Sequence, residues 1–500
     1  MKASNKNRNL LAWLLLSAMA ASALVGCAEK TNDSDAAQTT PALVSDTDVP
    51  EEEPDSLEAR KKVSDNLPDH NFEGADFRAI VQDSCAYDFW AEESKGDPWE
   101  DAIRQRNAKV AERFNVNINE PVIVNYSEIS NMVRKTVNSQ DDAYDIIFGQ
   151  METTGSDAMG GIFLNWYDIP NLDFSRPWYP KSLIENAATV NGRMFSLLSD
   201  LCLSYAQQTW AIMYDKVYAN NYNLPDLYDM VRSGEWTVDN FRTIVKDIYE
   251  DKNSNGKADE DDFYGYVTAG NGCLALAYFY GFNQKLVQIT EDNEVEMVLN
   301  CEKASDITDK LHELFFNTTG VRNLNGSGNG DLFGMFLKGN TIFAPIQVQY
   351  AYSQLRDYEN DYGILPFFKW DTNQEQYYSS VDAGSDVMAV PITATQNELI
   401  GYMVEALSCE SWKSVLPVYY DVVLNVKSIR DEDSVEMLNI LLDNREVDFA
   451  SLYNAWNGWV FELPAFLSSN KGFASTYKSK EKAKIKQYEK MLKPFLEEKT

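Results

Sequence analysis

The sequence predicts an α/β fold, because segments with the alternation of strands follow segments with helical spacing along most of the chain. The chain has 500 residues, of which 44% are hydrophobic and 12% are aromatic. A chain of this length and composition can build sizeable cores, either in two or three domains or in one body of two lobes.

The first part of the chain alternates strands and helices in a regular order. Short apolar or alternating runs predict strands, and apolar residues at helical spacing predict helices between them. The order is strand 77–81, helix 99–114, strand 115–119, helix 129–137 and strand 144–149. Such β-α-β-α-β order implies a mostly parallel sheet with right-handed crossovers. Ligands in these sheets bind at the carboxyl ends of strands, so the loop carrying Gln150 is a candidate binding edge.

The later part of the chain continues the α/β pattern. Thr237 and Asp331 each precede a helical pattern as N-caps. Residues 200–205 and 208–214 predict either a pair of strands or one strand with a crossing loop. Apolar runs predict strands at 341–344 and 362–366, and from residue 398 onward the sequence predicts mainly helices.

The first 27 residues have the features of an export signal. Lys2, Lys6 and Arg8 form a basic start, and residues 10–24 form an apolar segment too short for a comfortable membrane span. The segment ends at Cys27 in a pattern that resembles the lipobox of bacterial lipoproteins. We therefore expect a signal peptide at residues 1–26, lipid on Cys27, and an extracytoplasmic protein anchored to the cell membrane. The alternative is an ordinary signal peptide with a chance cysteine.

Residues 27–70 predict a disordered acidic tether. Residues 28–70 contain no Phe, Trp or Tyr and carry many more acidic than basic residues. Such a segment cannot bury enough apolar surface to offset the entropy cost of ordering it. The alternative is a folded prodomain.

The composition excludes several classes of function. The formal net charge of −33 argues against a nucleic-acid partner, because phosphate contacts need clustered Lys and Arg. Two histidines and widely spaced cysteines without a CxxC motif argue against a zinc centre or a disulfide framework, although one bridge stays open. The sequence contains no catalytic motif of the H-E-x-x-H or G-x-S-x-G type.

Residues 251–262 fit a calcium-binding loop of the EF-hand type. Oxygen ligands stand at loop positions 1, 3 and 5, a backbone carbonyl at position 7 and an acid at position 12, with Gly256 at the turn. These five positions are Asp251, Asn253, Asn255, Lys257 and Asp262. We expect one structural Ca²⁺ ion here. The alternative is a surface turn rich in Asn and Asp that holds no metal.

Five segments in order give the chain a resemblance to a known family. They are residues 144–148, 168–178, 234–237, 336–341 and 362–366. With the lipobox before them, the sequence resembles the bacterial extracellular solute-binding proteins, the lipid-anchored receptors of ABC importers. It is closest to the class that includes the maltose-binding protein.

This resemblance implies a two-lobed periplasmic-binding-protein-like fold with a ligand cleft between the lobes. It implies that residues 71–204 and 346–388 form lobe I, and that residues 205–345 and 389–500 form lobe II. It further implies a monomeric receptor that captures a sugar or oligosaccharide and delivers it to the permease subunits in the membrane.

Aromatic and polar residues at predicted strand ends are candidates for a sugar site. Aromatic rings cover the C–H faces of a sugar, and amide and carboxylate groups pair with its hydroxyls. The candidate ligand-binding residues are Gln150, Tyr205, Gln208, Trp210, Gln347, Gln349, Tyr350, Asp382, Trp456 and Trp459. The alternative for each aromatic residue is a place in the core.

Two other functions stay open on the sequence alone. A secreted, lipid-anchored glycoside hydrolase would also be acidic and rich in aromatic residues, but it needs a pair of carboxylates that no motif identifies. A receptor for peptides or another solute is the second alternative. The order of segments favours a binding receptor without catalytic residues.

Overall fold

The structure is a computed structural model that describes residues 57–91, 97–269, 272–324, 329–424, 432–453, 459–468 and 472–496. The chain divides into two compact units, residues 1–63 and residues 64–500. In the first unit the described part is helix α2 (Leu57–Lys62), in which Lys61 pairs with Glu58 at 2.8 Å.

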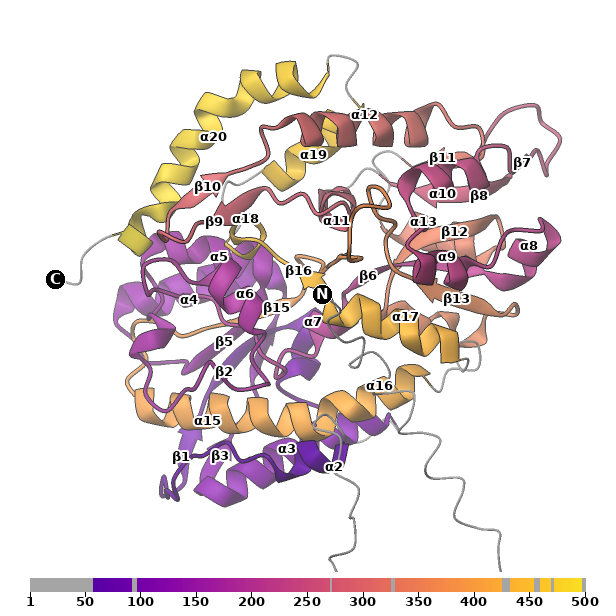
Figure 1. Ribbon diagram of the computed structural model, residues 1–500. Coiled ribbons are helices and arrows are strands. Elements are labelled where there is room, and N and C mark those ends of the chain that lie inside the picture. Colours follow the sequence, from indigo (N-terminus) through magenta and orange to yellow (C-terminus); the bar gives the residue numbers. More distant parts are fainter. Residues whose placement is uncertain are drawn as a thin grey trace, which may run out of the picture. The chain divides into compact units, whose positions relative to one another are not determined.

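One sheet of the second unit has four strands in the order β15-β5-β2-β4 (Figure 1). Their bounds are β2 (Ala79–Gln82), β4 (Val122–Val124), β5 (Ile146–Gln150) and β15 (Asp386–Ala389). Strand β2 runs parallel to β4 and β5, whereas β15 is antiparallel to β5. Strands β2 and β5 are buried along almost their whole length, as expected for a sheet with helices on its faces. The helices α3 (Pro98–Phe114) and α4 (Tyr126–Ser139) lie in the connections.

The other main sheet has six strands, with the path β11-β8-β12-β6-β13 and β7 paired to β8. Their bounds are β6 (Trp210–Asp215), β7 (Tyr249–Glu250), β8 (Phe263–Thr268), β11 (Val321–Asn323), β12 (Thr341–Gln347) and β13 (Tyr362–Leu365). Strand β6 is antiparallel to both β12 and β13, and β8 is parallel to β11 and β12. The two sheets form the centres of two α/β lobes, which confirms the predicted fold class.

Shorter strands and the remaining helices surround these sheets (Figure 1). The strands are β1 (Ala75–Phe77), β3 (Val116–Ile118), β9 (Val287–Ile289), β10 (Val295–Met297), β14 (Ser379–Ser380) and β16 (Arg445–Glu446). The helices up to the end of the second sheet are α5 (Met151–Asp157), α6 (Lys181–Leu183), α7 (Ser204–Gln207), α8 (Lys216–Asn221), α9 (Leu227–Ser233), α10 (Val238–Val245), α11 (Gly272–Gly281), α12 (Glu302–Phe316), α13 (Asn329–Leu337) and α14 (Gln349–Ser353). The later helices are α15 (Asn397–Glu410), α16 (Leu416–Leu424), α17 (Glu432–Asp443), α18 (Phe449–Leu452), α19 (Trp459–Ser468) and α20 (Phe473–Leu496).

Two segments carry the chain between the sheets, and they lie against each other. The first, residues 204–210, leads through α7 into β6, and the second, residues 379–386, leads through β14 into β15. Thr209 and Val381 form an antiparallel bridge, and the Asp382 amide donates to the Gln208 carbonyl at 3.0 Å. We call these two stretches the crossing segments. They join the lobes side by side, as a hinge requires.

The predicted division of the chain between the lobes is wrong in two places. Strand β13 was assigned to lobe I with residues 346–388, but it pairs with β6 in the second sheet. Helix α15 was assigned to lobe II with residues 389–500, but it packs against α3 of the first lobe (Figure 1). The chain therefore returns to the first lobe at β15, later than the order of segments indicated.

The predicted tether is also too long at its carboxyl end. Residues 57–62 are helical, and Asp65 is buried in the second unit, where Arg113 pairs with its carboxylate. The Phe72 amide donates to the Phe114 carbonyl at 2.9 Å. The partner charge of Arg113 explains the difference, because composition alone counts Asp65 as one more repelling acid. Residues 27–56, with Cys27, lie outside the described residues.

The structure also bears on several smaller predictions about local structure, cysteines and membrane spans. Residues 200–205 form turns and the start of α7 before strand β6, so the alternative of one strand with a crossing loop is confirmed and the pair of strands is wrong. Thr237 does cap α10, and its side chain accepts from the Asn240 amide. The cysteines in the described ranges, Cys85, Cys202, Cys273, Cys301 and Cys409, are free. Among the described helices, none is both long and apolar enough to span a bilayer.

Candidate ligand-binding site

The end of strand β5 supplies the first polar side chains of the site. Gln150 is the last residue of β5, and Glu152 lies in the first turn of α5. Both side chains are half-buried. The Met151 amide donates to the Ser385 carbonyl at 2.8 Å, and the Glu152 amide donates to the Ala383 carbonyl at 3.3 Å. The strand end is thereby fixed against the second crossing segment.

The second lobe contributes a tryptophan and a glutamine at the edge of its sheet. Trp210 begins β6 and lies opposite Gln347, the last residue of β12. Both are buried, with Trp210 only 1% exposed. The Trp210 indole donates to Asp382 Oδ2 at 3.1 Å, and the Gly384 amide donates to Asp382 Oδ1 at 2.9 Å. Asp382 thus connects the second crossing segment to the edge of the second sheet.

Three more side chains adjoin this contact. Gln349, at the start of α14, donates to Gln347 Oε1 at 2.6 Å. The ring centroid of half-buried Tyr350 lies 5.2 Å from that of Phe333. Gln208 is close to the loop of the second crossing segment, because a Cβ atom added at Gly384 would lie 3.0 Å from Gln208 Oε1.

These residues from both lobes form one group, which we call the crossing cluster. It consists of Gln150, Glu152, Gln208, Trp210, Gln347, Gln349, Tyr350 and Asp382. All but Glu152 were expected from the sequence. The cluster offers amide, carboxylate, phenol and indole groups, the set that pairs with a solute bearing many hydroxyls.

Burial sets the electrostatics of the cluster. Burial raises the pKa of Asp382, against the hydrogen bonds from Gly384 and Trp210. Burial also raises the pKa of Glu152, and the charge of Asp382 adds to this effect. Burial therefore favours the neutral form of both acidic groups, and within the described ranges neither of them is hydrogen-bonded to a Lys or Arg side chain.

A second polar group in the crossing segments is fully buried. Ser204 joins two acids of the first lobe, since its hydroxyl donates to Asp88 Oδ2 at 2.5 Å and accepts from the Asp386 amide at 3.0 Å. Gln82 donates to Asp386 Oδ1 at 2.5 Å. Burial raises the pKa of Asp88 to about 7. Burial and the charge of Asp88 raise the pKa of Asp386 well above its usual range.

The other predicted ligand-binding residues are placed differently. Tyr205 is buried in α7, where the Arg445 guanidinium lies 4.2 Å from its ring centroid. The burial of the ring and this contact with Arg445 indicate that Tyr205 has a packing role. Trp456 lies outside the described residues. Trp459 begins α19, but its side chain is also outside what the structure describes.

Glu152 is the member of the cluster that the sequence did not identify. It comes shortly after the predicted strand 144–149, in the same loop as Gln150. The rule that ligands bind beyond the carboxyl ends of strands would have included it.

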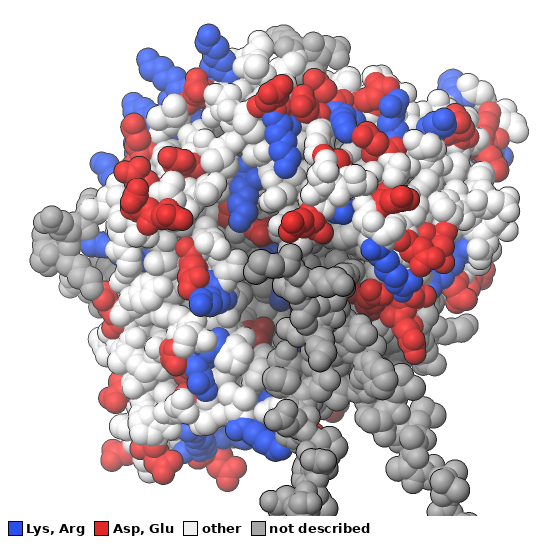
Figure 2. Space-filling model, in the orientation of Figure 1, with Lys and Arg blue, Asp and Glu red and all other residues white. Residues whose placement is uncertain are grey.

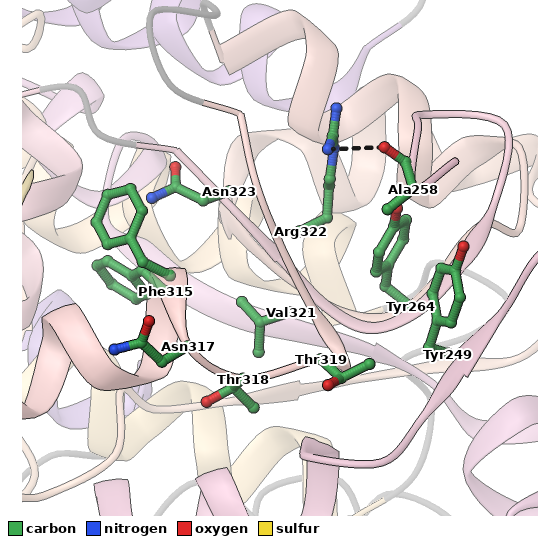
Figure 3. A pocket seen from close by; sticks show the side chains of 11 residues that line it. Tyr249, Ala258, Tyr264, Phe315, Asn317, Thr318, Thr319, Val321, Arg322 and Asn323 are labelled. Atoms are coloured by element: carbon green, nitrogen blue, oxygen red, sulfur yellow. Dashed lines mark hydrogen bonds between the residues drawn. The ribbon is translucent and has the colours of Figure 1, made fainter. Parts of the chain in front are cut away.

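A cavity of about 460 Å³ lies elsewhere, on the second lobe (Figure 3). It is bounded by β7, β8, β11 and the end of α12, and no residue of the crossing cluster lines it. Tyr249, Tyr264 and Phe315 form part of its wall, and Arg322 donates to the Ala258 carbonyl at 3.3 Å (Figure 3). The cavity is thus separate from the junction between the lobes.

No known family model matches this chain, and no curated protein matches it either. Solved structures do match. The GacH receptor of Streptomyces glaucescens, solved unliganded and with acarbose, is 14% identical with a TM-score of 0.51, over 85% of this chain and 100% of its own. A solute-binding protein of an ABC transporter from Thermotoga lettingae, bound with α-D-tagatose, is 11% identical with a TM-score of 0.53, over 84% and 100%.

A third match has a different ligand. UgpB from Mycobacterium tuberculosis, in complex with glycerophosphocholine, is 13% identical with a TM-score of 0.53, over 84% of this chain and 99% of its own. All three match over nearly the whole of their own length, and the first two are a receptor and a solute-binding protein. The chain therefore has the two-lobed fold of the solute-binding proteins of ABC importers, as its ordered segments indicated.

Proposed function

We propose that this protein is the solute-binding receptor of an ABC importer and that the crossing cluster binds its solute. The observation that carries this proposal is the meeting of polar and aromatic side chains from both lobes at the segments that join them. A solute held by both lobes binds the closed arrangement better than an open one, and it shifts the population toward closure. Such a receptor presents the closed form to the permease subunits.

The chemistry of the cluster supports a sugar or oligosaccharide as the solute. Glutamine amides and carboxylates pair with hydroxyl groups, and the rings of Trp210 and Tyr350 supply apolar surface. The carboxyl groups of Asp382 and Glu152 disfavour phosphate-bearing solutes. Acarbose and tagatose, bound by two of the proteins with this fold, are of the favoured class, whereas glycerophosphocholine is not.

The protein acts outside the cytoplasm, as a monomer and without turnover of its solute. Its overall acidity supports the absence of a nucleic-acid partner, and on the face in Figure 2 the Lys and Arg side chains are interspersed with Asp and Glu.

A binding screen tests the proposal. Maltose, maltotriose, D-tagatose, a tripeptide and glycerophosphocholine are added to the purified chain, followed by calorimetry and product analysis.

We expect stoichiometric binding of a sugar with no change in its structure. Formation of sugar products would instead favour the glycoside hydrolase. Binding of the tripeptide or glycerophosphocholine alone would overturn the sugar assignment and leave the receptor in place.

Replacing Asp382 by Ala is expected to weaken binding of that sugar about 10- to 100-fold. The variant loses a hydrogen-bonding carboxylate and releases the Trp210 indole, and one good buried polar contact accounts for roughly 1.5–3 kcal/mol. Calorimetry measures the change, and the melting temperature of the sugar-free variant verifies folding. Asp309→Ala, on the exposed side of α12, is the matched control and should bind like wild type. Equal affinity in Asp382→Ala would remove this residue from the site.

Replacing Cys27 by Ser is expected to move the protein from the membrane fraction to the soluble fraction. The proposal assigns the membrane attachment to lipid on this cysteine, which a serine side chain cannot carry. Fractionation of cells that express each form, followed by immunoblotting, measures the distribution. A Cys301→Ser variant is the control, since Cys301 is an exposed cysteine of the folded body. Continued membrane fractionation of Cys27→Ser would contradict the lipid anchor.

A further inference from the structure

The loop between β7 and β8 folds around its own acidic and amide side chains. It spans residues 251–262, and Gly256 at its turn has φ +70°, which favours glycine. The Gly256 amide donates to Asp251 Oδ2 at 2.9 Å, and the Asn255 amide donates to Asp251 Oδ1 at 3.2 Å. The carboxylate of the first loop residue therefore points to the inside of the turn.

The next two candidate ligands face the same interior. Asn253 Oδ1 accepts from the Asn255 amide at 3.0 Å, and Asn255 Oδ1 accepts from the Lys257 amide at 2.7 Å. Each amide oxygen has a second lone pair for another partner. The oxygens of loop positions 1, 3 and 5 are thus held by backbone amides of the loop itself, before any ion is considered.

Asp262 provides an independent observation. Its side chain is fully buried, and Oδ2 accepts from the Asp259 amide at 3.1 Å and from the Tyr249 hydroxyl at 3.0 Å. Its other oxygen, Oδ1, is buried without a hydrogen-bond partner. A buried carboxylate oxygen that no donor or cation satisfies costs folding free energy. The contact between Asp262 Oδ2 and the Asp259 amide places this carboxylate, with its unpartnered Oδ1, against the loop.

We propose that Ca²⁺ binds in this loop and satisfies Asp262 Oδ1. The ligands are the side-chain oxygens of Asp251, Asn253, Asn255 and Asp262 and the Lys257 carbonyl. Hard oxygen donors from carboxylate, amide and backbone groups are the set that Ca²⁺ prefers. Across the described ranges, no three His, Cys, Asp or Glu side chains form a metal site by themselves. The two amides and the carbonyl are therefore necessary members of this one.

The second half of the loop is already fixed from outside. Arg322 of β11 donates to the Ala258 carbonyl (Figure 3), Tyr264 of β8 donates to the Asp259 carbonyl at 2.9 Å, and the Asn340 amide group donates to the Glu260 carbonyl at 2.9 Å. The first half, residues 251–257, is held as well, since Lys252 donates to the Gly339 carbonyl at 3.0 Å and Asn253 and Asn255 donate to the Asp259 carboxylate. The ion adds one more connection between the two halves. Its role is to brace the outer edge of that sheet, remote from the crossing cluster.

Calorimetric titration of the whole chain with CaCl₂, after removal of metal with a chelator, tests the proposal. Wild type is expected to bind one ion per chain and to melt at a higher temperature with calcium, since an ion that binds the folded state alone stabilises it. Asp251→Asn and Asp262→Asn keep the size of each side chain and remove one ligand charge. Each is expected to bind calcium at least about tenfold more weakly, because affinity follows the charge of the ligands.

Asp261→Asn is the matched control, because it removes one charge from the same loop at an exposed side chain outside the ligand set. It is expected to bind within about twofold of wild type, since an exposed charge is largely screened by solvent. If the buried Asp262→Asn variant does not fold, the Asp251→Asn variant alone tests the proposal. The proposal is overturned if wild type binds no calcium at about 10 mM, above the dissociation constants of weak extracellular sites. It is also overturned if Asp251→Asn and Asp261→Asn bind alike.

Discussion

At pH 7 the Asp386→Asn variant is expected to be more stable than wild type, and this difference in stability is expected to shrink as the pH falls. Asp386 has a pKa well above its usual range because it is buried beside Asp88. The unfolded pKa of an aspartate is about 3.9, so as the pH rises above this value the unfolded state releases the Asp386 proton before the folded state does. The stability that this group contributes is therefore fully present below the unfolded pKa and is lost as the pH rises. An amide needs no proton, so the variant lacks this loss.

The local structure accommodates the substitution. The amide introduced at position 386 would keep an oxygen to accept from Gln82, and its amino group can donate toward the Asp88 carboxylate. Denaturant unfolding at pH 4, 5.5 and 7 measures the difference, which should be small at pH 4 and grow with pH. Asp88 retains its own slope, because burial rather than Asp386 raises the pKa of that carboxyl. An exposed Asp292→Asn variant is the control. Parallel curves for wild type and Asp386→Asn would contradict the expectation.

Replacing Arg106 by Met is expected to destabilise the folded protein by about 3–5 kcal/mol. The Arg106 guanidinium is 2% exposed and donates to the Asp88 and Phe89 carbonyls and to Ser411 Oγ, each at 3.0 Å. Met fills much of the volume but leaves these acceptors and the Asp88 carboxylate without a buried cation. Removing one partner of a buried charged network has a cost of this size. The Asn107 amide group still donates to the Phe89 carbonyl in this variant, which limits the loss of stability.

Arg104→Met, on the same helix α3, is the control for this change. The Arg104 side chain is about a third exposed and pairs with Asp101. An exposed pair of this kind contributes about 1 kcal/mol or less. Chemical denaturation of both variants gives the comparison. A loss below about 1 kcal/mol in Arg106→Met would show that the hydrogen bonds of the Arg106 guanidinium are replaced by water or by side-chain movement.

The sequence predicted the strand ends of the site better than it predicted the lobes. Gln150, Trp210 and Gln347 each stand at the end of an apolar run, and local pattern is enough to find such positions. Asp382 and Glu152 meet them only through the crossing segments, which join parts of the chain that are far apart in sequence. The network of Asp88, Ser204 and Asp386 has no local pattern at all.

Two features of the fold could not be decided from local pattern, for the same reason. Residues 200–205 are apolar because they are buried where the lobes join, and burial alone does not distinguish a strand from a buried turn or short helix. Strand β13 was assigned to the wrong lobe because an apolar run does not identify its partner, and β6 supplies that partner from far upstream. The loop at residues 251–262 is different, since its candidate ligands are local and their spacing can be seen directly in the sequence.

The pairing of β15 with β5 has a consequence for how the chain folds. Strand β5 needs residues 386–389 as its neighbour, so the first lobe cannot complete its sheet until most of the chain has been synthesised. Closing so long a loop is entropically costly and slows folding. Until then β5 is an exposed, apolar sheet edge, the kind of surface that chaperones bind and that aggregates when unprotected. Late completion of the first lobe keeps the nascent chain unfolded for longer, the state in which a polypeptide can be threaded through a membrane.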